Sequence, residues 1–230
     1  MVTTTITITM ITAMTTKPEK YTYLRDPAEI YRHSFALIDE AVDMSALPAD
    51  LAPVAARLVH ACGMADIVDD LAYSEGAAAV GRAALRSGAV IFADAEMVAA
   101  GIIRDRLPGD NAVICTLNDD GMAKRARDLA TTRSAAALDA WRDRIEGSVV
   151  TIGNAPTALF RLLELLAEGW PRPALILGFA VGFVGAAESK QALIDSAPRL
   201  GVPYITLRGK CGGSALAAAA VNALAGDADQ

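Results

Sequence analysis

The chain has 230 residues, enough for one α/β domain, and its hydrophobic content of 53% includes only 5% aromatic residues. A net charge of −6 and few aromatic side chains argue against nucleic acid as a partner, and no apolar run reaches the roughly 18 residues of a membrane span. The three cysteines, Cys62, Cys115 and Cys211, form no Cys-x-x-Cys pair. We therefore expect a cytoplasmic protein without a disulfide framework or a structural zinc site.

The start of the chain differs in composition from the rest. The first 16 residues are rich in threonine, and they lack the basic start and the long apolar core of a signal peptide. We expect residues 1–16 to be a disordered leader and residues 17–230 to form a single α/β domain.

The first part of this domain has helical patterns. Residues 26–29, Asp-Pro-Ala-Glu, combine an N-cap, a proline at the first helical position and a capping-box acid, which predicts a helix from there to about Glu40. Further helices are expected over residues 48–62 and 74–87, the second of them ended by Gly88.

From residue 89 onward, strands and helices are expected to alternate. Short apolar runs predict strands at residues 89–93, 111–116, 148–152, 174–178 and 203–208, and helices are expected at 95–99, 122–130, 134–145, 157–167, 186–196 and 214–224. Runs that do not alternate between apolar and polar residues are typical of strands buried on both faces. The fold class we predict is α/β, a doubly wound and mainly parallel sheet with helices on both faces, with a ligand site beyond the C-terminal strand ends.

Three glycine-containing junctions between strands and helices stand out, at residues 153–157, 182–190 and 208–214. Glycine lets backbone N–H groups approach a ligand, and a helix N-terminus attracts negative charge, so together they indicate sites for carboxylates or phosphates. Tight turns also need glycine for geometry alone, and that structural alternative stays open. A complete dinucleotide fingerprint and a P-loop are both absent from the sequence, which disfavours a nucleotide-dependent oxidoreductase.

His60 is one of two histidines and lies in the last turn of a predicted helix that Gly63 closes. The partial negative charge of a helix C-terminus favours the protonated imidazole, so the position suits a proton donor near neutral pH. A neutral core histidine is the structural alternative. The order of residues does not match a Ser-His-Asp hydrolase, and no histidine spacing indicates a catalytic metal.

Two further charged residues, Arg133 and Asp94, lie where a strand or a helix begins or ends, and we predict a contact for each. Arg133 opens a helix, where its charge opposes the helix dipole, so a bound anion or an acidic neighbour would explain it. Asp94 follows a predicted strand, and we expect it to cap the next helix.

Taken together, several segments resemble the precorrin-8X methylmutase family. They are residues 23–27, 30–35, 59–63, 94–98, 132–136, 153–159, 182–190 and 212–214, and the match runs in unbroken order from about Tyr21 to Leu224. The resemblance implies an isomerase of cobalamin biosynthesis that moves a methyl group from carbon 11 to carbon 12 of precorrin-8X, giving hydrogenobyrinic acid. It also implies a homodimer with the site near the subunit interface, a catalytic role for His60, and substrate contact at Ser34 and Arg133.

The chemistry of the residues agrees with this resemblance. Methyl migration within one ring system needs no second substrate, so we expect no cofactor and no bound metal, and a single acid is sufficient. The substrate-binding residues that we predict beside the catalytic His60 are Ser34, Thr132, Arg133, Asn154, Gly182, Lys190, Gly213 and Ser214. The high alanine content favours a buried interface and hence a homodimer. A protein that carries or sequesters a tetrapyrrole without turnover is the alternative.

Overall fold

The computed structural model describes residues 21–226, and the predicted leader lies outside this range. The helices are α1 (Pro27–Ala41), α2 (Ala52–Cys62), α3 (Ala77–Arg86), α4 (Glu96–Gly101), α5 (Met122–Asp128), α6 (Arg133–Ala137), α7 (Pro156–Ala167), α8 (Ala186–Leu200) and α9 (Ser214–Ala225). The strands are β1 (Leu71–Tyr73), β2 (Ile91–Ala93), β3 (Val113–Ile114), β4 (Val149–Ile152), β5 (Leu175–Gly178) and β6 (Tyr204–Leu207). No helix in this range is long and apolar enough to cross a bilayer.

The strands form one sheet in the order β1-β6-β5-β4-β2-β3. All neighbouring pairs are parallel except β1 and β6, which are antiparallel. The chain leaves β2 toward β3 on one side and returns to β4 on the other, so the strand order reverses between β2 and β4. This arrangement confirms the predicted mainly parallel, doubly wound sheet, in which ligands bind near the reversal.

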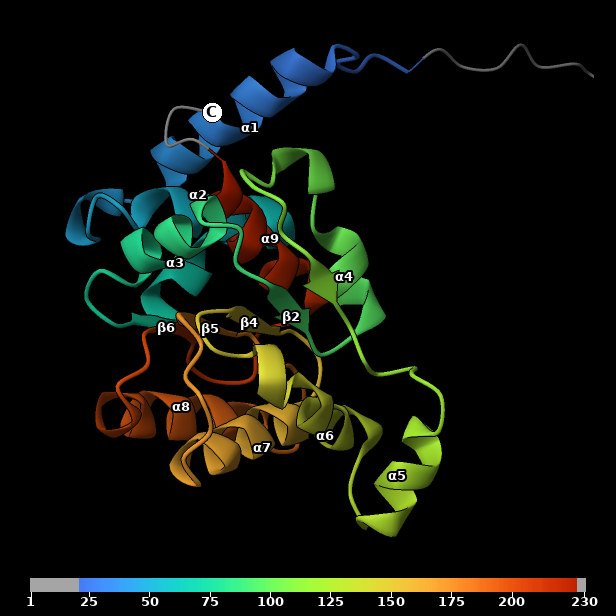
Figure 1. Ribbon diagram of the computed structural model, residues 1–230. Helices are drawn as coiled ribbons and strands as arrows, with labels where there is room; N and C mark the ends of the chain where they lie inside the picture. The colour runs from blue at the N-terminus through green and yellow to red at the C-terminus, as the bar shows by residue number, and fades with distance from the viewer. Residues whose placement is uncertain (1–20, 227–230) are drawn as a thin grey trace, which may run out of the picture.

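Helices cover both faces of the sheet. In Figure 1, α2, α3, α4 and α9 lie above the sheet, and α6, α7 and α8 lie below it. Each face has its own apolar core: one is built from α2, α3, α4 and α9, and the other mainly from α7, α8 and the segment before β4. The helix α1 lies outside this layered body, against α2 (Figure 1).

The alanine-rich helix α9 explains part of the unusual composition. Ten of its twelve residues are buried. A Cβ atom added at Gly101 or Gly153 would lie 2.7 Å from the Cβ atom of an α9 alanine, so α4 and the end of β4 approach this helix too closely for larger side chains. These alanines therefore serve packing within one chain, and they give no support to the interface that the composition led us to expect.

Several predicted boundaries differ from the structure. The helix expected over residues 134–145 is divided into α6 and a 3-10 helix, η4 (Leu138–Arg144). The ring of Trp141 in η4 stacks on Phe92 at a centroid distance of 4.9 Å, and its Nε1 donates to Thr116 Oγ1 at 2.8 Å. Of the strand predicted over residues 111–116, residues 113–114 pair in the sheet as β3. The short edge strand β1 was not predicted.

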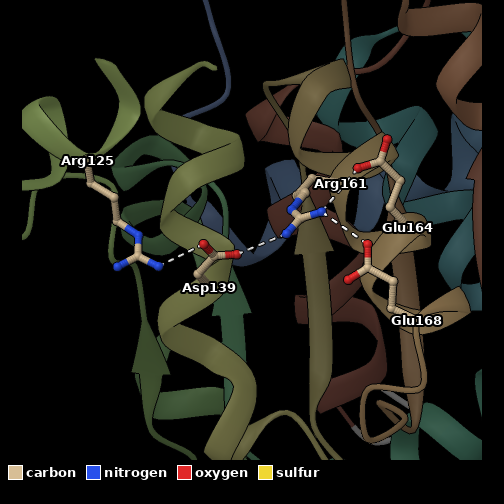
Figure 2. A network of polar contacts seen from close by, with 5 residues as sticks. All are labelled: Arg125, Asp139, Arg161, Glu164 and Glu168. Carbon is tan, nitrogen blue, oxygen red and sulfur yellow. Dashed lines mark hydrogen bonds and ion pairs between the residues drawn. The ribbon is translucent and has the colours of Figure 1, made fainter. Parts of the chain in front are cut away.

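An ion-pair network ties the projecting helix α5 to the layer below the sheet (Figures 1 and 2). Arg125 of α5 contacts the Asp139 carboxylate at 2.8 Å, and Arg161 of α7 contacts the same carboxylate at 3.6 Å. Arg161 also lies near Glu164 and Glu168, at 3.3 and 3.6 Å. The network therefore fixes the segment that leads into α6.

Candidate active site

The three glycine junctions lie side by side at the C-terminal edge of the sheet. The N–H of Gly213, after β6, donates to the Phe179 carbonyl, after β5, at 2.8 Å. A Cβ atom at Gly153, after β4, would lie 2.9 Å from the Cα atom of Ser214. The structure thus brings together the loops that carry Asn154, Gly182, Gly213 and Ser214.

The end of α2 reaches the same edge of the sheet. The antiparallel strand β1 begins opposite the end of β6, where Leu71 pairs with Leu207 and the Arg208 N–H donates to the Asp70 carbonyl at 2.7 Å. Burial raises the pKa of the Cys62 thiol at the end of α2, and the nearby Cys211 thiol adds to this effect. His60 therefore lies on a helix whose end is next to the β6–α9 loop.

His60 is held by α1. Its Nδ1 lies 2.8 Å from Ser34 Oγ, and its ring stacks on Phe35 with centroids 5.1 Å apart. Tyr31, Ser34 and Phe35 share one face of α1 because they are three and four residues apart. His60 is an exposed residue, and within residues 21–226 its Nε2 has no hydrogen-bond partner, so this nitrogen is available to a ligand while Ser34 orients the ring.

The pKa of His60 is shifted in the direction opposite to our prediction. Burial of part of the ring lowers the pKa below its ordinary value of 6.5, and the positive charge of Arg57 adds to the shift. The Arg57 guanidinium lies over the rings of Tyr31 and Phe35, at 5.3 and 5.4 Å from their centroids. Desolvation and this neighbouring cation therefore favour the neutral imidazole in the free protein. The spacing of three residues between Arg57 and His60 was the sequence feature that could have revealed this pairing.

Asp94 does not cap the helix that follows it, which corrects our prediction. Its carboxylate is only 2% exposed and accepts hydrogen bonds from the N–H groups of residues 153–155, at 2.8, 3.0 and 2.8 Å. Burial raises the pKa of the Asp94 carboxyl, and the three N–H groups oppose that shift. Because β2 and β4 are neighbours, the end of β2 faces this loop directly. The protein's own carboxylate therefore occupies the amides before α7, and only the exposed Asn154 side chain is left to contact a ligand there.

A second polar group surrounds the start of α6. Thr132 caps this helix by accepting from the Ala135 N–H at 3.1 Å, and its hydroxyl lies 2.7 Å from that of Thr157. The exposed Arg133 reaches the Asn118 carbonyl oxygen at 3.4 Å, so an amide and not the expected acidic neighbour contacts its guanidinium. Asn118 in turn donates to Glu96 at 3.4 Å, a contact that the sequence did not reveal because the two residues are 22 positions apart.

Lys190 lies behind the β6–α9 loop. Its side chain is fully buried, and its Nζ donates to the carbonyl of Cys211. Burial lowers the pKa of Lys190 to about 8. The ammonium thus points into the protein, whereas we had expected it to contact the substrate.

The His60 group and the Arg133 group remain separate in a single chain. Within residues 21–226, no hydrogen bond or ion pair joins them. A cleft of about 630 Å³ lies between α1, α2 and the end of α9. Tyr31, Phe35 and Arg57 line it, but His60 does not. What the arrangement offers chemically is an oriented, exposed imidazole, next to a loop region with backbone amides and basic side chains for an anion.

Comparisons with known proteins agree on one family. The family model of precorrin-8X methylmutase matches residues 29–226. The chain is 61% identical over 203 residues to the precorrin-8X methylmutase of Pseudomonas aeruginosa, covering 88% of this chain and 97% of that protein. It is 52% identical over 206 residues to the enzyme of the same name from Sinorhizobium sp, covering 90% and 97%.

More distant relatives include an enzyme named for the cobalt-containing substrate and a protein with a crystal structure. The cobalt-precorrin-8 methylmutase of Priestia megaterium is 34% identical over 199 residues, covering 86% of this chain and 87% of that protein. The crystal structure of precorrin-8x methyl mutase from Thermus thermophilus superposes with a TM-score of 0.78 at 36% identity, covering 86% of this chain and 94% of that chain. The fold, the family match and these identities lead to one conclusion: the chain belongs to the precorrin-8X methylmutase family of isomerases in corrin biosynthesis.

Proposed function

We propose that this protein converts precorrin-8X into hydrogenobyrinic acid, and that His60 is the general acid that protonates ring C of the macrocycle. The observation that carries the proposal is the Ser34–His60 contact of 2.8 Å, which holds one ring nitrogen and leaves the other open to a ligand. The family match supports the reaction, and the geometry supports the residue.

The reaction is an internal rearrangement. The bond from the methyl group to carbon 11 breaks and a bond to carbon 12 forms, while the composition of the molecule stays the same. Protonation of ring C makes the terminus of migration electron-poor and lowers the barrier. Because substrate and product are isomers, the acid that lends a proton recovers one in each turnover. Proton transfer of this kind contributes about 10²–10⁴-fold to a rate.

A His60 with a lowered pKa can still serve as an acid if the bound substrate raises that pKa. Precorrin-8X carries several carboxylates, and a negative charge near an imidazole favours its protonated form. Binding therefore raises the pKa of His60, so the proton is taken up as the polyanion binds. The nearby Arg57, which lowers this pKa in the free protein, makes the resulting imidazolium a stronger acid.

The carboxylate arms of the substrate need several donors. We propose direct contacts from Ser34, Arg133 and the Asn154 side chain, and from the loops at Thr132, Gly182, Gly213 and Ser214, as the sequence predicts. Arg133 is exposed, and its one hydrogen bond within residues 21–226 goes to an amide oxygen, which leaves the guanidinium available to a carboxylate. The amides of residues 153–155 are excluded from this role, since Asp94 occupies them.

We further infer that the natural substrate is metal-free. The relatives at 61% and 52% identity are named for precorrin-8X, whereas the one at 34% is named for the cobalt form.

We also propose a cytoplasmic homodimer. All three cysteines are free thiols, as expected in a reducing compartment. The large apolar side chains of Ile30 and Leu37 on α1 are exposed in a single chain, as are those of Phe183 and Val184 at the loop after β5. Such apolar surface favours a partner subunit at the edge of the site.

Turnover of His60→Ala tests the proposed acid. We expect its rate with precorrin-8X to fall by about 10²–10⁴-fold, while its affinity for hydrogenobyrinic acid stays within a few-fold of the wild type. His33→Ala, which removes the other histidine on exposed surface, is the matched control and should keep wild-type turnover. We also expect wild-type turnover to be faster with precorrin-8X than with cobalt-precorrin-8.

Three results would contradict the proposal. Near-normal turnover by His60→Ala would remove the role of His60. Product binding by the wild type without any absorbance change on incubation with substrate would instead indicate a carrier. Faster turnover of cobalt-precorrin-8 would overturn the metal-free assignment.

A further inference from the structure

Lys190 is a buried cation whose hydrogen bond goes to a carbonyl oxygen. It lies in the second turn of α8 with a side-chain exposure of 0%, and its described hydrogen bond goes to the Cys211 carbonyl. Within residues 21–226, no carboxylate lies within ion-pair distance of its Nζ. A buried ammonium costs free energy unless its donors are satisfied, so an amine at this position calls for a reason beyond packing.

The Cys211 carbonyl, which Lys190 contacts, belongs to a loop that hydrogen bonds and close packing hold at several points. This loop joins β6 to α9, and the N–H of Gly213 at its end donates to Phe179 at 2.8 Å. The Gly182 N–H donates to the Lys210 carbonyl at 3.4 Å. Gly212 packs so tightly against the carbonyls of residues 179 and 180 that a Cβ atom has no room there. The hydrogen bond from Lys190 holds this loop from its inner side, where the backbone alone makes no such contact.

The outer side of the same loop is suited to an anion. Arg208 and Lys210 are exposed, and Gly213, the N-cap residue of the following helix α9, provides no side chain to cap the first N–H groups of that helix. A positive charge next to the Cys211 carbonyl polarises the peptide group. The N–H groups on the outer side of the loop therefore become stronger hydrogen-bond donors. Lys190 supplies this charge without taking up space in the site.

We propose that Lys190 is a positioning residue, which holds residues 208–213 from within so that their amides and Lys210 face a carboxylate of the substrate. It does not contact the substrate itself, which revises the direct role predicted from the sequence. The identity of the anion as a tetrapyrrole carboxylate rests on the proposed function, whereas the fastening of the loop does not.

This role has a consequence for pH. Lys190 faces two titratable groups, Cys211 from the loop and Asp70 from the segment before β1, and burial is the main cause of its pKa of about 8. An anion bound across the loop favours the ammonium, so it raises this pKa. By linkage, affinity for the anion is full below pH 8 and falls as the pH rises above it.

Product binding and loop exchange test the inference in the full chain. We would titrate hydrogenobyrinic acid by absorbance at pH 7 and pH 9, and follow amide hydrogen exchange of residues 208–214 in the free protein. Lys190→Met should weaken binding about tenfold at pH 7, remove the loss of affinity between pH 7 and pH 9, and speed exchange of the loop. Lys190→Arg should restore the affinity and keep it at pH 9. Lys124→Met, which removes an equal charge from exposed α5, should behave as the wild type.

Each outcome decides the inference. Unchanged loop exchange in Lys190→Met overturns it even if the protein proves to bind no tetrapyrrole, a result that would separately remove the proposed function. Wild-type affinity that stays level from pH 7 to pH 9 also overturns it, and this measurement needs no variant. A product complex with Nζ of Lys190 on a carboxylate would show direct contact and contradict the positioning role.

Discussion

At the scale of single residues, the neighbours of His60 determine its chemistry. Ser34 orients the ring from α1, and Arg57 lies one turn earlier on α2 over two aromatic rings. Burial and the charge of Arg57 lower the pKa of His60, which favours the neutral imidazole in the free protein. For the acid role that we propose, His60 must therefore first gain its proton.

Removing the charge of Arg57 should change this pKa. We expect the pKa of His60 in Arg57→Gln to rise, because one of the two causes that lower it is lost while the long side chain can still cover Tyr31. NMR titration of the His60 ring protons measures the shift, and the pKa on the alkaline side of the pH profile of kcat/KM, where a general acid loses its proton, should move the same way, since that profile reports the free enzyme. Arg57→Lys keeps the charge and serves as the control. A pKa of His60 that stays the same in Arg57→Gln would show that desolvation alone lowers it.

At the scale of elements, α1 packs little against the rest of the described chain. Ile38 is the one buried residue of its fifteen, although α1 carries Ser34 and two aromatic side chains of the site. Figure 1 shows it outside the layered body, resting on α2. Because α1 holds the Ser34–His60 contact and has so little support within one chain, we propose it as the place where a second subunit packs.

A charge on the open face of α1 should separate the subunits. Leu37 is 51% exposed in the single chain, and we expect Leu37→Glu to lower the molar mass in light scattering from twice 24.0 kDa to 24.0 kDa, with reduced turnover. Leu129→Glu is the matched control, because Leu129 is 52% exposed but lies beyond α5, away from α1. A wild-type mass of one chain, or a Leu37→Glu protein that remains dimeric, would contradict this role for α1.

At the scale of the whole molecule, the sequence predicted the fold best where runs of neighbouring residues determine a strand or a helix. The strands β4, β5 and β6 and the helices after them follow from apolar runs and glycine junctions, and they define the edge of the sheet that carries the site. The antiparallel β1 was missed because three residues after a 3-10 helix give no period to recognise.

The site itself depends on contacts between distant parts of the chain, and these were harder to predict. Ser34 and His60 are 26 residues apart, and the family resemblance implied a separate role for each of them but not their contact. Asp94 was expected to cap its own helix, but the neighbouring strand offers three N–H groups from residues 59–61 positions away. Lys190 was predicted to bind the substrate because it is a cation in the glycine-containing junction at residues 182–190, and nothing in that segment indicates that its amine bonds the loop after β6.

The central claim is that His60 gives its proton to ring C, and a crystal structure of the protein with hydrogenobyrinic acid bound tests it most directly. The account predicts that Nε2 of His60 lies within about 3.2 Å of ring C, with Ser34 on the opposite ring nitrogen and carboxylate arms on Arg133 and the β6–α9 loop. If the imidazole lies away from the macrocycle, with another acid of this chain or of a partner subunit against ring C, the mechanism is wrong.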